Sequence, residues 1–481
     1  MSFFPLKKSI LLLSLISSNV LADIQAQNSS LSFSQRALST TANPADAAIA
    51  VERDDSHVMT GGMINLGGAL EYGNLDELFE LYNDISNDFE PSEPPDGTPV
   101  NPIEPPPKYD GIDWDKIFEK YPELEDQLDA IKDQVVDIAS LLALIATEGY
   151  GKAELDLEIP LILNEDLWGG TLMMGFSAAG YSKANGILEE IIFDSDQARS
   201  ELEKIPDIPE DAGIQELDLS GGITLVYDPF NKNAKVWIDN DSLLLVKAAM
   251  VNEFMLSYSK KAFENEYGSL YWGVRPTLYY VGMTNLGVRL GDLDDAEAIF
   301  DDIKNGDYIW ESGFDFDLGL TWSSKHYQLG LSLDNVVEST YDYPEIDRRR
   351  YSSIKVLEEL DYHESFTLDR QLTLQAAIYT EDRNWSLSMD LDANPIKDPM
   401  KDRFQWLSVS AGYAADSWWL PSARVGFSRN LVGSELAYLT AGITFAKFIN
   451  LDVSSTLDTV TIDDTDYMRG LNITLGVQFD Y

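Results

Sequence analysis

The chain ends in LNITLGVQFDY, residues 471–481, a stretch in which apolar and polar side chains alternate without a break. The apolar positions are Leu471, Ile473, Leu475, Val477, Phe479 and Tyr481. Period-two alternation places successive side chains on opposite faces of a strand, so one face of this strand is wholly apolar. A strand of a closed barrel can run to the last residue of a chain, whereas the termini of soluble domains are usually frayed and polar.

The final strand resembles the C-terminal signal of bacterial outer-membrane β-barrels, in which a terminal aromatic residue follows alternating apolar positions. This resemblance implies that Phe479 and Tyr481 form an assembly signal for the barrel-assembly machinery. A soluble sandwich with the same alternating strand is the alternative interpretation of this stretch on its own.

The other end of the chain indicates export. MSFFPLKKSILLLSLISSNVLA, residues 1–22, has two lysines, then an apolar run, then a small-residue cleavage pattern at Val20-Leu21-Ala22. These are the parts of a secretory signal peptide, so we expect the mature chain to begin near Asp23. The apolar run is too short to span the hydrocarbon core of a membrane.

Charge and cysteine content exclude several classes of function. The 481 residues carry 82 Asp and Glu against 34 Lys and Arg, a formal net charge of −48, which opposes binding to nucleic-acid phosphates. The sequence contains no Cys, so disulfide scaffolds, thiol chemistry and Cys-zinc sites are excluded. We therefore expect no direct nucleic-acid binding, and a fold held together by strand pairing and packing.

Alternation like that of the C-terminal strand recurs from Lys152 onward. In KAELDLEIPLIL, residues 152–163, apolar side chains oppose a face made of Lys152, Glu154, Asp156 and Glu158. In GFDFDLGLTW, residues 313–322, they oppose Asp315, Asp317, Gly319 and Thr321. A charged second face predicts contact with water, either in a barrel lumen or in open solvent.

Further segments bring the count to about fourteen to sixteen strands, within the range of outer-membrane barrels. The regular ones are HYQLGLSLD, QLTLQAAIY, NWSLSMDLDA, LSVSAGY, ARVGFS, LTAGITF and INLDVSS. Less regular ones lie near 172–180, 217–227, 234–239, 250–258 and 270–280. We predict an all-β fold with a helical insert, an antiparallel outer-membrane β-barrel of about 14 strands.

Connection lengths support the same fold. Short links near Glu264, Ser323-Ser324-Lys325 and Glu381-Asp382-Arg383 alternate with long ones around Leu293 to Asp307 and in YDYPEIDRRRY, residues 341–351. Short turns on one side and long loops on the other are the barrel pattern. Propellers and large sandwiches share the alternating strands, so a soluble secreted β-rich binding protein stays an alternative.

Aromatic residues gather where the predicted strands end, as in the interface belts of membrane barrels. They are Trp322, Tyr327, Trp385, Trp418, Trp419, Phe445 and Phe448. The mature sequence has no run of eighteen apolar residues, so a membrane location requires a barrel. We therefore expect the chain in the outer membrane of a Gram-negative bacterium, in contact with outer-membrane lipid.

A different kind of sequence lies between Tyr72 and Lys152. Residues 74–89 have apolar positions at helical spacing, and a second helix is predicted where a heptad stripe runs from Leu124 to Ile145. The acidic, Pro-rich stretch 90–108 separates the two helices, and its composition predicts an extended linker. The two helices can form a hairpin, bind a partner as a coiled coil, or lie against a membrane surface.

These observations predict four parts of the chain. The signal peptide is 1–22, and an N-terminal region with the first strand covers 23–72, a region that the family resemblance described next implies is a hatch. A helical hairpin insert with the Pro-rich acidic linker covers 73–151, and the barrel covers 152–481.

The element Ala42-Asn43-Pro44-Ala45 resembles the Asn-Pro-Ala element of the FadL family of long-chain fatty-acid transporters. In that family the N-terminal region forms a hatch that plugs a fourteen-stranded barrel. The resemblance implies a FadL-like barrel and makes Asn43 and Pro44 candidate hatch residues. The long insert between Tyr72 and Lys152 departs from FadL.

A fuller resemblance is to the TraF-type plasmid-transfer family, whose members are predicted FadL-like barrels and differ from the thioredoxin-like protein that is also called TraF. It rests on Val251-Asn252-Glu253, Leu256-Ser257-Tyr258, Trp272-Gly273-Val274-Arg275-Pro276, GFDFDLGLTW, GLSLDNV and Leu368-Asp369-Arg370-Gln371. The paired helices also fit this family. The resemblance implies a role in conjugal transfer.

The sequence lacks the motifs of an enzyme. His57, His326 and His363 are far apart, and no HExxH, GxSxG or P-loop motif is present, so we expect no catalytic residues, no metal site and no cofactor. The acidic stretches at Asp292 to Asp302 and Asp463 to Asp466 lack EF-hand spacing and are more typical of solvated loops than of Ca²⁺ sites.

Three functions stay open at this point. The protein is a non-enzymatic barrel of a plasmid-transfer apparatus or a channel, a FadL-like transporter of small hydrophobic molecules, or a soluble secreted binding protein. The first predicts conjugation or secretion components as partners, and the second predicts a small hydrophobic ligand. Lumen-facing Asp and Glu residues would select cations if a pore opens.

Overall fold

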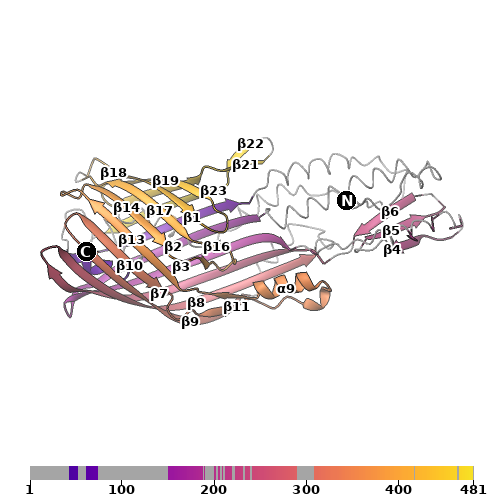
Figure 1. Ribbon diagram of the computed structural model, residues 1–481, viewed down its shortest axis with the longest axis horizontal. Helices are drawn as coiled ribbons and strands as arrows, with labels where there is room; N and C mark the ends of the chain where they lie inside the picture. Colours follow the sequence, from indigo (N-terminus) through magenta and orange to yellow (C-terminus); the bar gives the residue numbers. More distant parts are fainter. Residues whose placement is uncertain are drawn as a thin grey trace.

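In the computed structural model, fourteen antiparallel strands of the described chain close into one barrel (Figure 1). The structure describes residues 43–52, 61–73, 150–187, 241–289, 308–415, 418–462 and 465–479, with shorter pieces between 189 and 238. In order around the barrel the strands are β1 (Gly62–Tyr72), β2 (Tyr150–Leu167), β3 (Gly170–Ile187), β7 (Leu243–Asn265), β8 (Gly268–Arg289), β9 (Ile309–Ser323), β10 (Tyr327–Asp334), β13 (Gln371–Tyr379), β14 (Trp385–Asp392), β17 (Trp406–Tyr413), β18 (Ser422–Asn430), β19 (Ala437–Phe445), β20 (Ile449–Thr456) and β23 (Gly470–Phe479). The predicted barrel of about fourteen strands is confirmed.

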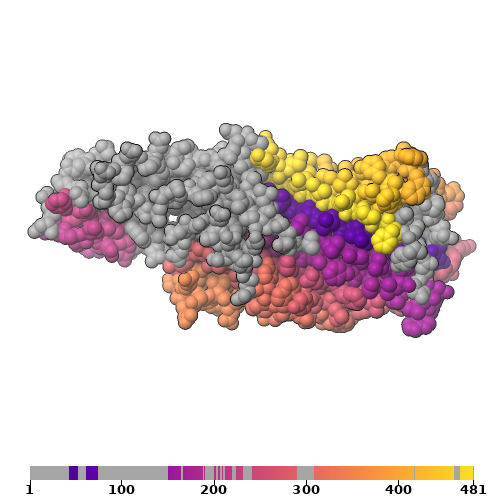
Figure 2. All heavy atoms as spheres, turned by 180° about the vertical axis from the view of Figure 1, so that it is seen from behind, coloured from indigo at the N-terminus to yellow at the C-terminus, as the bar shows by residue number. Residues whose placement is uncertain are grey.

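The C-terminal strand closes the barrel. β23 pairs with β20 on one side and with β1 on the other, where Gly62 lies opposite Phe479 and Leu66 opposite Leu475. Figure 2 shows β1 between β23 and β2 on the outer surface. Closure leaves no unpaired strand edge along this seam, which explains why regular alternation continues almost to the end of the chain.

The two faces of the barrel wall differ in polarity. Leu318, Leu329 and Ile473 point outward and are 42%, 51% and 47% exposed. The neighbouring inward residues Asp317 and Asn472 are at most 2% exposed. The exterior is therefore apolar and the inner wall is polar, as expected of a barrel with lipid outside. Within the described residues, no helix has the length and apolar character to cross a membrane.

Short turns and long connections alternate from β1 to β17, which includes the hairpins for which this was predicted, and the short turns lie at the end where β23 ends (Figure 1). Aromatic side chains gather at this end. The Trp322 indole donates to the Tyr327 hydroxyl at 3.3 Å, and the rings of Trp385 and Tyr413 lie 4.9 Å apart. These positions fit the aromatic belt of a membrane interface.

The strands differ greatly in length. β2, β3, β7 and β8 have 18 to 23 residues, whereas the eight strands from β10 to β23 have 8 to 10. A tilted strand needs only about 9–11 residues to cross a bilayer, so the long strands project beyond it at the end with the long connections. The predicted segments 250–258 and 270–280 were too short because alternation fades there. Val246 and Ala248, on the outward face of β7, are buried.

The predicted segments 217–227 and 234–239 are strands, but counting them toward the barrel was wrong. They form a separate three-stranded sheet of β4 (Gln215–Asp218), β5 (Ile223–Asp228) and β6 (Asn233–Ile238), within the connection from β3 to β7. Alternation identifies a two-faced strand without telling which sheet contains it.

Further elements lie in the other long connections. They are β11 (Thr340–Asp342), η4 (Arg348–Arg350), α9 (Ile354–His363), β12 (Ser365–Thr367), β15 (Ile396–Lys397), β16 (Arg403–Phe404), β21 (Thr459–Ile462) and β22 (Thr465–Met468). Helix α9 was not predicted. Its sequence signals are Ser353, whose side chain accepts from the Val356 N–H at 3.5 Å, and the buried pair Val356 and Leu360, four residues apart.

Several predictions concern residues outside those that the structure describes. They are the signal peptide 1–22, the helices and linker of the insert 73–151, His57, the acidic stretch at 292–302, and Tyr481.

The seam between β1 and β23 gives a first testable prediction. A Cβ added at Gly62 would meet the Phe479 ring at 2.9 Å, so this ring lies against the first strand. Phe479→Ala should reduce the fraction of outer-membrane protein whose gel mobility shifts on heating, because closed barrels resist detergent until heated. Trp419→Ala, at a turn residue that is 96% exposed, is the control and should leave this fraction unchanged. Equal fractions in both variants would contradict the role of Phe479 in closure.

Candidate functional site

Residues 43–52, here called the hatch, lie inside the barrel. They comprise a turn at Asn43 to Ala45 and the short helix α3 (Asp46–Glu52). Helix α3 lies against β2, β3, β7 and β8, while Asn43 contacts β9, β10 and β13. The hatch therefore touches seven consecutive strands, half of the barrel wall. The structure thus places the candidate hatch residues Asn43 and Pro44 in the lumen.

The turn follows from the sequence Asn-Pro-Ala-Asp. The Asp46 N–H donates to the Asn43 carbonyl at 3.1 Å, which closes a four-residue turn with Pro44 at its second position. Proline favours that position because its ring fixes φ near the value that the turn requires. The Ala45 N–H donates to the Asn43 side-chain oxygen at 3.0 Å, so one residue organises the entry to α3.

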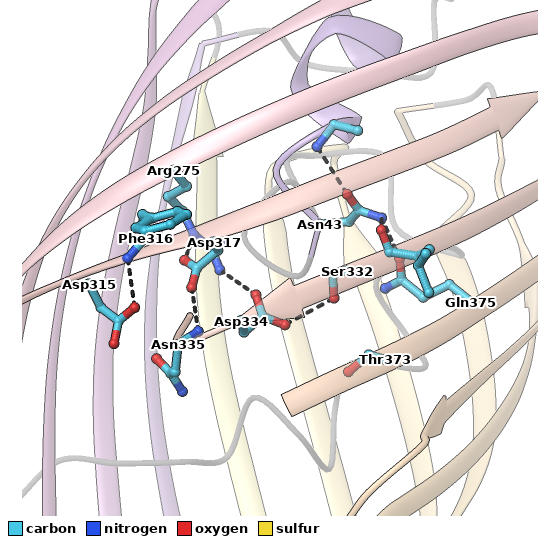
Figure 3. Close-up of polar contacts among 12 residues, drawn as sticks. Asn43, Arg275, Asp315, Phe316, Asp317, Ser332, Asp334, Asn335, Thr373 and Gln375 are labelled. Atoms are coloured by element: carbon cyan, nitrogen blue, oxygen red, sulfur yellow. Dashed lines mark hydrogen bonds and ion pairs between the residues drawn. The ribbon is translucent and has the colours of Figure 1, made fainter. Parts of the chain in front are cut away.

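The Asn43 amide nitrogen faces the wall at the junction of three strands (Figure 3). It lies 3.1 Å from the Gln375 side-chain oxygen on β13, and 3.4 Å and 3.5 Å from the carbonyl oxygens of Leu331 and Leu320. Asn43 has no exposed surface. An aspartate in its place would bring a negative charge without donors to these three acceptors.

Three inward-facing glycines form the surface beneath this turn, here called the glycine seat: Gly273 of β8, Gly319 of β9 and Gly330 of β10. Gly273 and Gly319 are register partners. A Cβ at Gly273 would lie 2.6 Å from the Ala45 nitrogen, and one at Gly319 would lie 2.8 Å from the same atom. Because Cβ atoms do not approach backbone so closely, the wall must be glycine where the hatch backbone rests on it.

Helix α3 is held by polar groups of the wall. The Asp46 carboxylate accepts from the Thr321 hydroxyl at 2.8 Å and from the Gln328 amide at 3.4 Å. On the opposite side, the Ser259 hydroxyl accepts from the Ala48 N–H at 2.8 Å. These bonds come from β9, β10 and β7, so α3 is bound from two sides.

Apolar packing supplements these bonds. Ala47 packs with Met63, Ile162 and Met173, while Ala45, Ala48 and Ile49 pack with Tyr271. Three of the hatch residues involved are alanines, whose small side chains let the helix approach the wall closely.

Glu52 ends the hatch with an ion pair. Its carboxylate accepts from the Tyr271 hydroxyl at 2.6 Å and pairs with Lys261, which also pairs with Glu264. Burial raises the pKa of Glu52, but the hydrogen bonds from Lys261 and Tyr271 and the charge of Lys261 outweigh it, so the pKa lies below its ordinary value of 4.5. A depressed pKa means that this contact contributes above pH 4.5 and is lost as the pH falls through the folded-state value.

A buried charged cluster lies beside the Asn43 turn (Figure 3). Arg275 of β8 donates to Asp317 at 2.7 Å and to Asp334 at 3.2 Å, and Ser332 donates to Asp334 at 2.9 Å. Bonds that join ionised partners are about twice as strong as neutral ones. The cluster therefore ties together β8, β9 and β10 next to the glycine seat.

The carboxylates of β9 also bind the chain that follows β10. β9 continues beyond the last residue of β10, and there Asp317 accepts from the Asn335 N–H at 2.9 Å. Asp315 accepts from the N–H groups of Val337 and Glu338 at 2.8 Å and 3.0 Å. This charged face lies toward the lumen as expected, but Asp315 and Asp317 are buried and bind backbone N–H groups and Arg275 where contact with water was expected.

Nearer the long connections, the inner wall becomes apolar. A buried cluster joins inward residues of β3, β7 and β8 to residues of the connections that cover them. Its members are Tyr181, Ala249, Val251, Tyr279, Val281, Met283, Tyr341, Tyr343, Phe366 and Met400. Beyond the hatch, the lumen therefore has an apolar part formed by this cluster.

The described residues contain no group of acidic, His or Cys side chains suited to hold a metal ion. Burial and the neighbouring Lys247 ammonium lower the pKa of His363 to about 3, so its imidazole is neutral. Its Nδ1 lies 3.5 Å from the Lys247 Nζ. The contacts described above show a lumen that holds the hatch through hydrogen bonds, packing and one ion pair.

Sequence reasoning identified Asn43 and Pro44 but missed the residues that receive them. Within the hatch it missed Asp46, and on the wall it missed Ser259, Gly273, Gly319, Thr321, Gln328, Gly330 and Gln375. One signal was available for the glycines, since an isolated glycine on the inward face of a strand indicates close approach by another backbone. Phe479, the other predicted residue in the described chain, lies at the seam and not in this site.

Comparison with known families gives one match, and it covers most of the chain. The family model described as "F plasmid transfer operon, TraF, protein" matches residues 40–392. This range includes the hatch, the glycine seat and the Arg275 cluster. No curated protein matches the chain.

Several solved structures resemble the chain at low identity. A FadL homologue from Pseudomonas aeruginosa is 11% identical with a TM-score of 0.39, covering 96% of this chain and 98% of that one. The TodX deltaS2S3 mutant monoaromatic hydrocarbon channel is 10% identical with a TM-score of 0.38, covering 92% and 95%. The Ralstonia pickettii toluene transporter TbuX is 9% identical with a TM-score of 0.35, covering 96% and 95%. TM-scores below 0.5 carry no weight for function.

The Arg275 cluster gives a second prediction. Arg275→Ala leaves Asp317 and Asp334 buried without their cation, so the free energy of unfolding should fall by about 3–5 kcal/mol. Arg370→Ala is the control. It removes an exposed ion pair in which Arg370 Nη2 lies 3.1 Å from Glu338 Oε2, and it should lower the free energy of unfolding by less than about 1 kcal/mol. Urea unfolding of the barrel in detergent, followed by tryptophan fluorescence, measures both. Equal losses would show that the cluster does not stabilise the wall.

Proposed function

The chain belongs to the F plasmid transfer operon TraF protein family, and we propose that it is a plugged outer-membrane barrel that serves a plasmid-transfer apparatus as a gated channel. The apolar exterior of the closed barrel supports a location in the outer membrane of a Gram-negative bacterium. The family match over residues 40–392 supports the transfer role. A soluble binding protein would not expose such an apolar surface, so that alternative is not retained.

One observation carries the gating proposal: besides its apolar packing, the hatch is bound to the lumen wall through separate polar contacts, one of which is the Glu52–Lys261 ion pair. Asn43, Asp46, Ala48 and Glu52 make eight such contacts with side chains and carbonyls of the wall. At about 0.5–1.5 kcal/mol each, they hold the hatch by roughly 4–12 kcal/mol. A partner that binds with micromolar affinity supplies about 8 kcal/mol, enough to compete with them.

In this proposal the barrel is closed when alone and opens when a conjugation or secretion component binds. The protein supplies a passage and performs no chemistry itself. Asn43 and Pro44 shape the part of the hatch that rests on the glycine seat, so they govern closure.

Passage of a small apolar molecule is a second candidate function. The observation that favours it is the buried cluster that includes Tyr279, Met283, Phe366 and Met400, because apolar and aromatic side chains are the usual lining of sites for such molecules. It requires the same movable hatch, so the experiment below tests both candidates.

The glycine seat gives the third prediction. Gly273→Ala and Gly319→Ala, combined in one chain, place methyl groups against the hatch backbone, and overpacking costs about 1–3 kcal/mol per site. Each 1.4 kcal/mol shifts the open fraction about tenfold. Ionic current through planar bilayers that contain the purified full chain should therefore rise by about tenfold or more.

Gly151→Ala is the matched control, because a Cβ at this strand glycine meets nothing within 4 Å, and its current should equal that of the unaltered chain. Unchanged current in the seat variant, with a normal heat-dependent mobility shift, would contradict the gated channel. Unchanged current together with faster entry of labelled toluene into vesicles would favour the second candidate.

A further inference from the structure

A second segment occupies the barrel, at the opposite end from the hatch. Residues 393–405, here called the strap, connect β14 to β17 and contain β15 and β16. These two barrel strands are neighbours and pair directly, so a short loop would suffice to join them. The strap instead reaches inward to β2, β3 and β7.

The strap contacts the far side of the barrel. In the strand order, β2 lies seven strands from β14 in both directions, which is diametrically opposite in a barrel of fourteen. Lys152 of β2 forms an ion pair with Asp398 of the strap at 2.6 Å. The strap therefore crosses the lumen from one side to the other.

Charged side chains hold the strap in this position, and of the two strap carboxylates Asp398 is buried and Asp402 is half-buried. Lys152 also pairs with Glu154 at 2.6 Å, and Lys183 of β3 pairs with Asp402. Lys247 of β7 donates to the Pro399 carbonyl at 3.2 Å. Removing one partner from such a set leaves a charge without its counterion, so a single lysine substitution should destabilise the closed arrangement.

The tip of the strap is a tight turn closed by its own hydrogen bonds. The Asp402 N–H donates to the Asp398 carboxylate at 2.8 Å, and the Asp398 N–H donates to the Asp402 carbonyl at 3.0 Å. Lys401 between them has a φ of 72°, which completes a tight turn. Met400 at this tip is buried among the apolar cluster of the lumen, and Tyr343 donates to Pro399 at 2.7 Å.

The strap and the hatch contact opposite ends of the same strands. Lys152, Lys183 and Lys247 lie within a few residues of the strand ends that lead to the long connections. Ser259 and Gly273 contact the hatch near the short turn between β7 and β8. Anything that passes through the lumen would have to pass both.

We propose that the strap is a second gate, in series with the hatch, which the lysines of β2, β3 and β7 lock through Asp398, Pro399 and Asp402. The inference rests on the proposed function of a gated channel. It means that displacing the hatch alone opens the passage incompletely, and that full opening also requires release of the strap.

The test compares four full-length chains in planar bilayers: the unaltered chain, the strap variant Lys152→Gln with Lys183→Gln, the hatch variant Gly273→Ala with Gly319→Ala, and all four changes together. The strap variant alone should conduct like the unaltered chain, because the hatch still closes it. The fourfold variant should conduct about tenfold more than the hatch variant. Lys325→Gln, which breaks an exposed pair with Glu381, should add nothing to the hatch variant.

A reversible cross-link serves as a control for misfolding, because it compares the closed and the released strap in one and the same protein. The chain has no native Cys, so Lys152→Cys with Asp398→Cys, in the hatch variant, can be joined by a cleavable bifunctional thiol reagent. Current should fall on cross-linking and return on cleavage in the same protein.

The outcomes separate the two proposals. If the hatch variant conducts as much as the fourfold variant, or cross-linking leaves the current unchanged, the second gate is wrong and the gated channel stands. If the strap variant alone opens a current, the two gates are not in series. If no combination conducts, the proposed function itself is wrong.

Discussion

A strand edge in hydrocarbon has no water to satisfy its backbone groups, and this constraint shapes the whole barrel. It requires β23 to pair with β1, which keeps apolar and polar side chains alternating up to Phe479. It also explains the inward carboxylates of β9. Where β10 ends and β9 continues, Asp315 and Asp317 bind the backbone N–H groups of the chain that leaves the wall, and Arg275 balances their charge.

A closed wall creates a lumen, and the two ends of the lumen are occupied in different ways. The hatch rests on glycines and is held by single hydrogen bonds from several strands. The strap is held by ion pairs with lysines of the long strands, of which the Lys152–Asp398 pair is the more buried. The two ends of the lumen are therefore closed by different interactions: hydrogen bonds, apolar packing and the Glu52–Lys261 pair at the hatch, and lysine–aspartate pairs at the strap.

The membrane made much of this fold predictable from sequence. Lipid on one face and a polar lumen on the other impose alternation, so most of the short strands and the order of short and long connections could be predicted. Outside the bilayer alternation is not required. The predicted strands for β7 and β8 were therefore too short, and the β5–β6 hairpin was counted with the barrel. Asn43 and Pro44 could be proposed because they form a recognisable local motif. The residues that receive them, such as Gly319 and Gln375, are more than 200 positions away, and only the strand register brings them together.

The account depends most on the hatch being inside the barrel, and cysteine labelling tests this directly because the chain has no native Cys. Ala48 is 7% exposed against the wall, whereas Trp419 is 96% exposed at a turn. A thiol reagent that does not cross membranes should label the Trp419→Cys chain at once, and the Ala48→Cys chain only after the barrel is unfolded. Equally rapid labelling of both folded chains would place residue 48 outside the lumen and contradict the account.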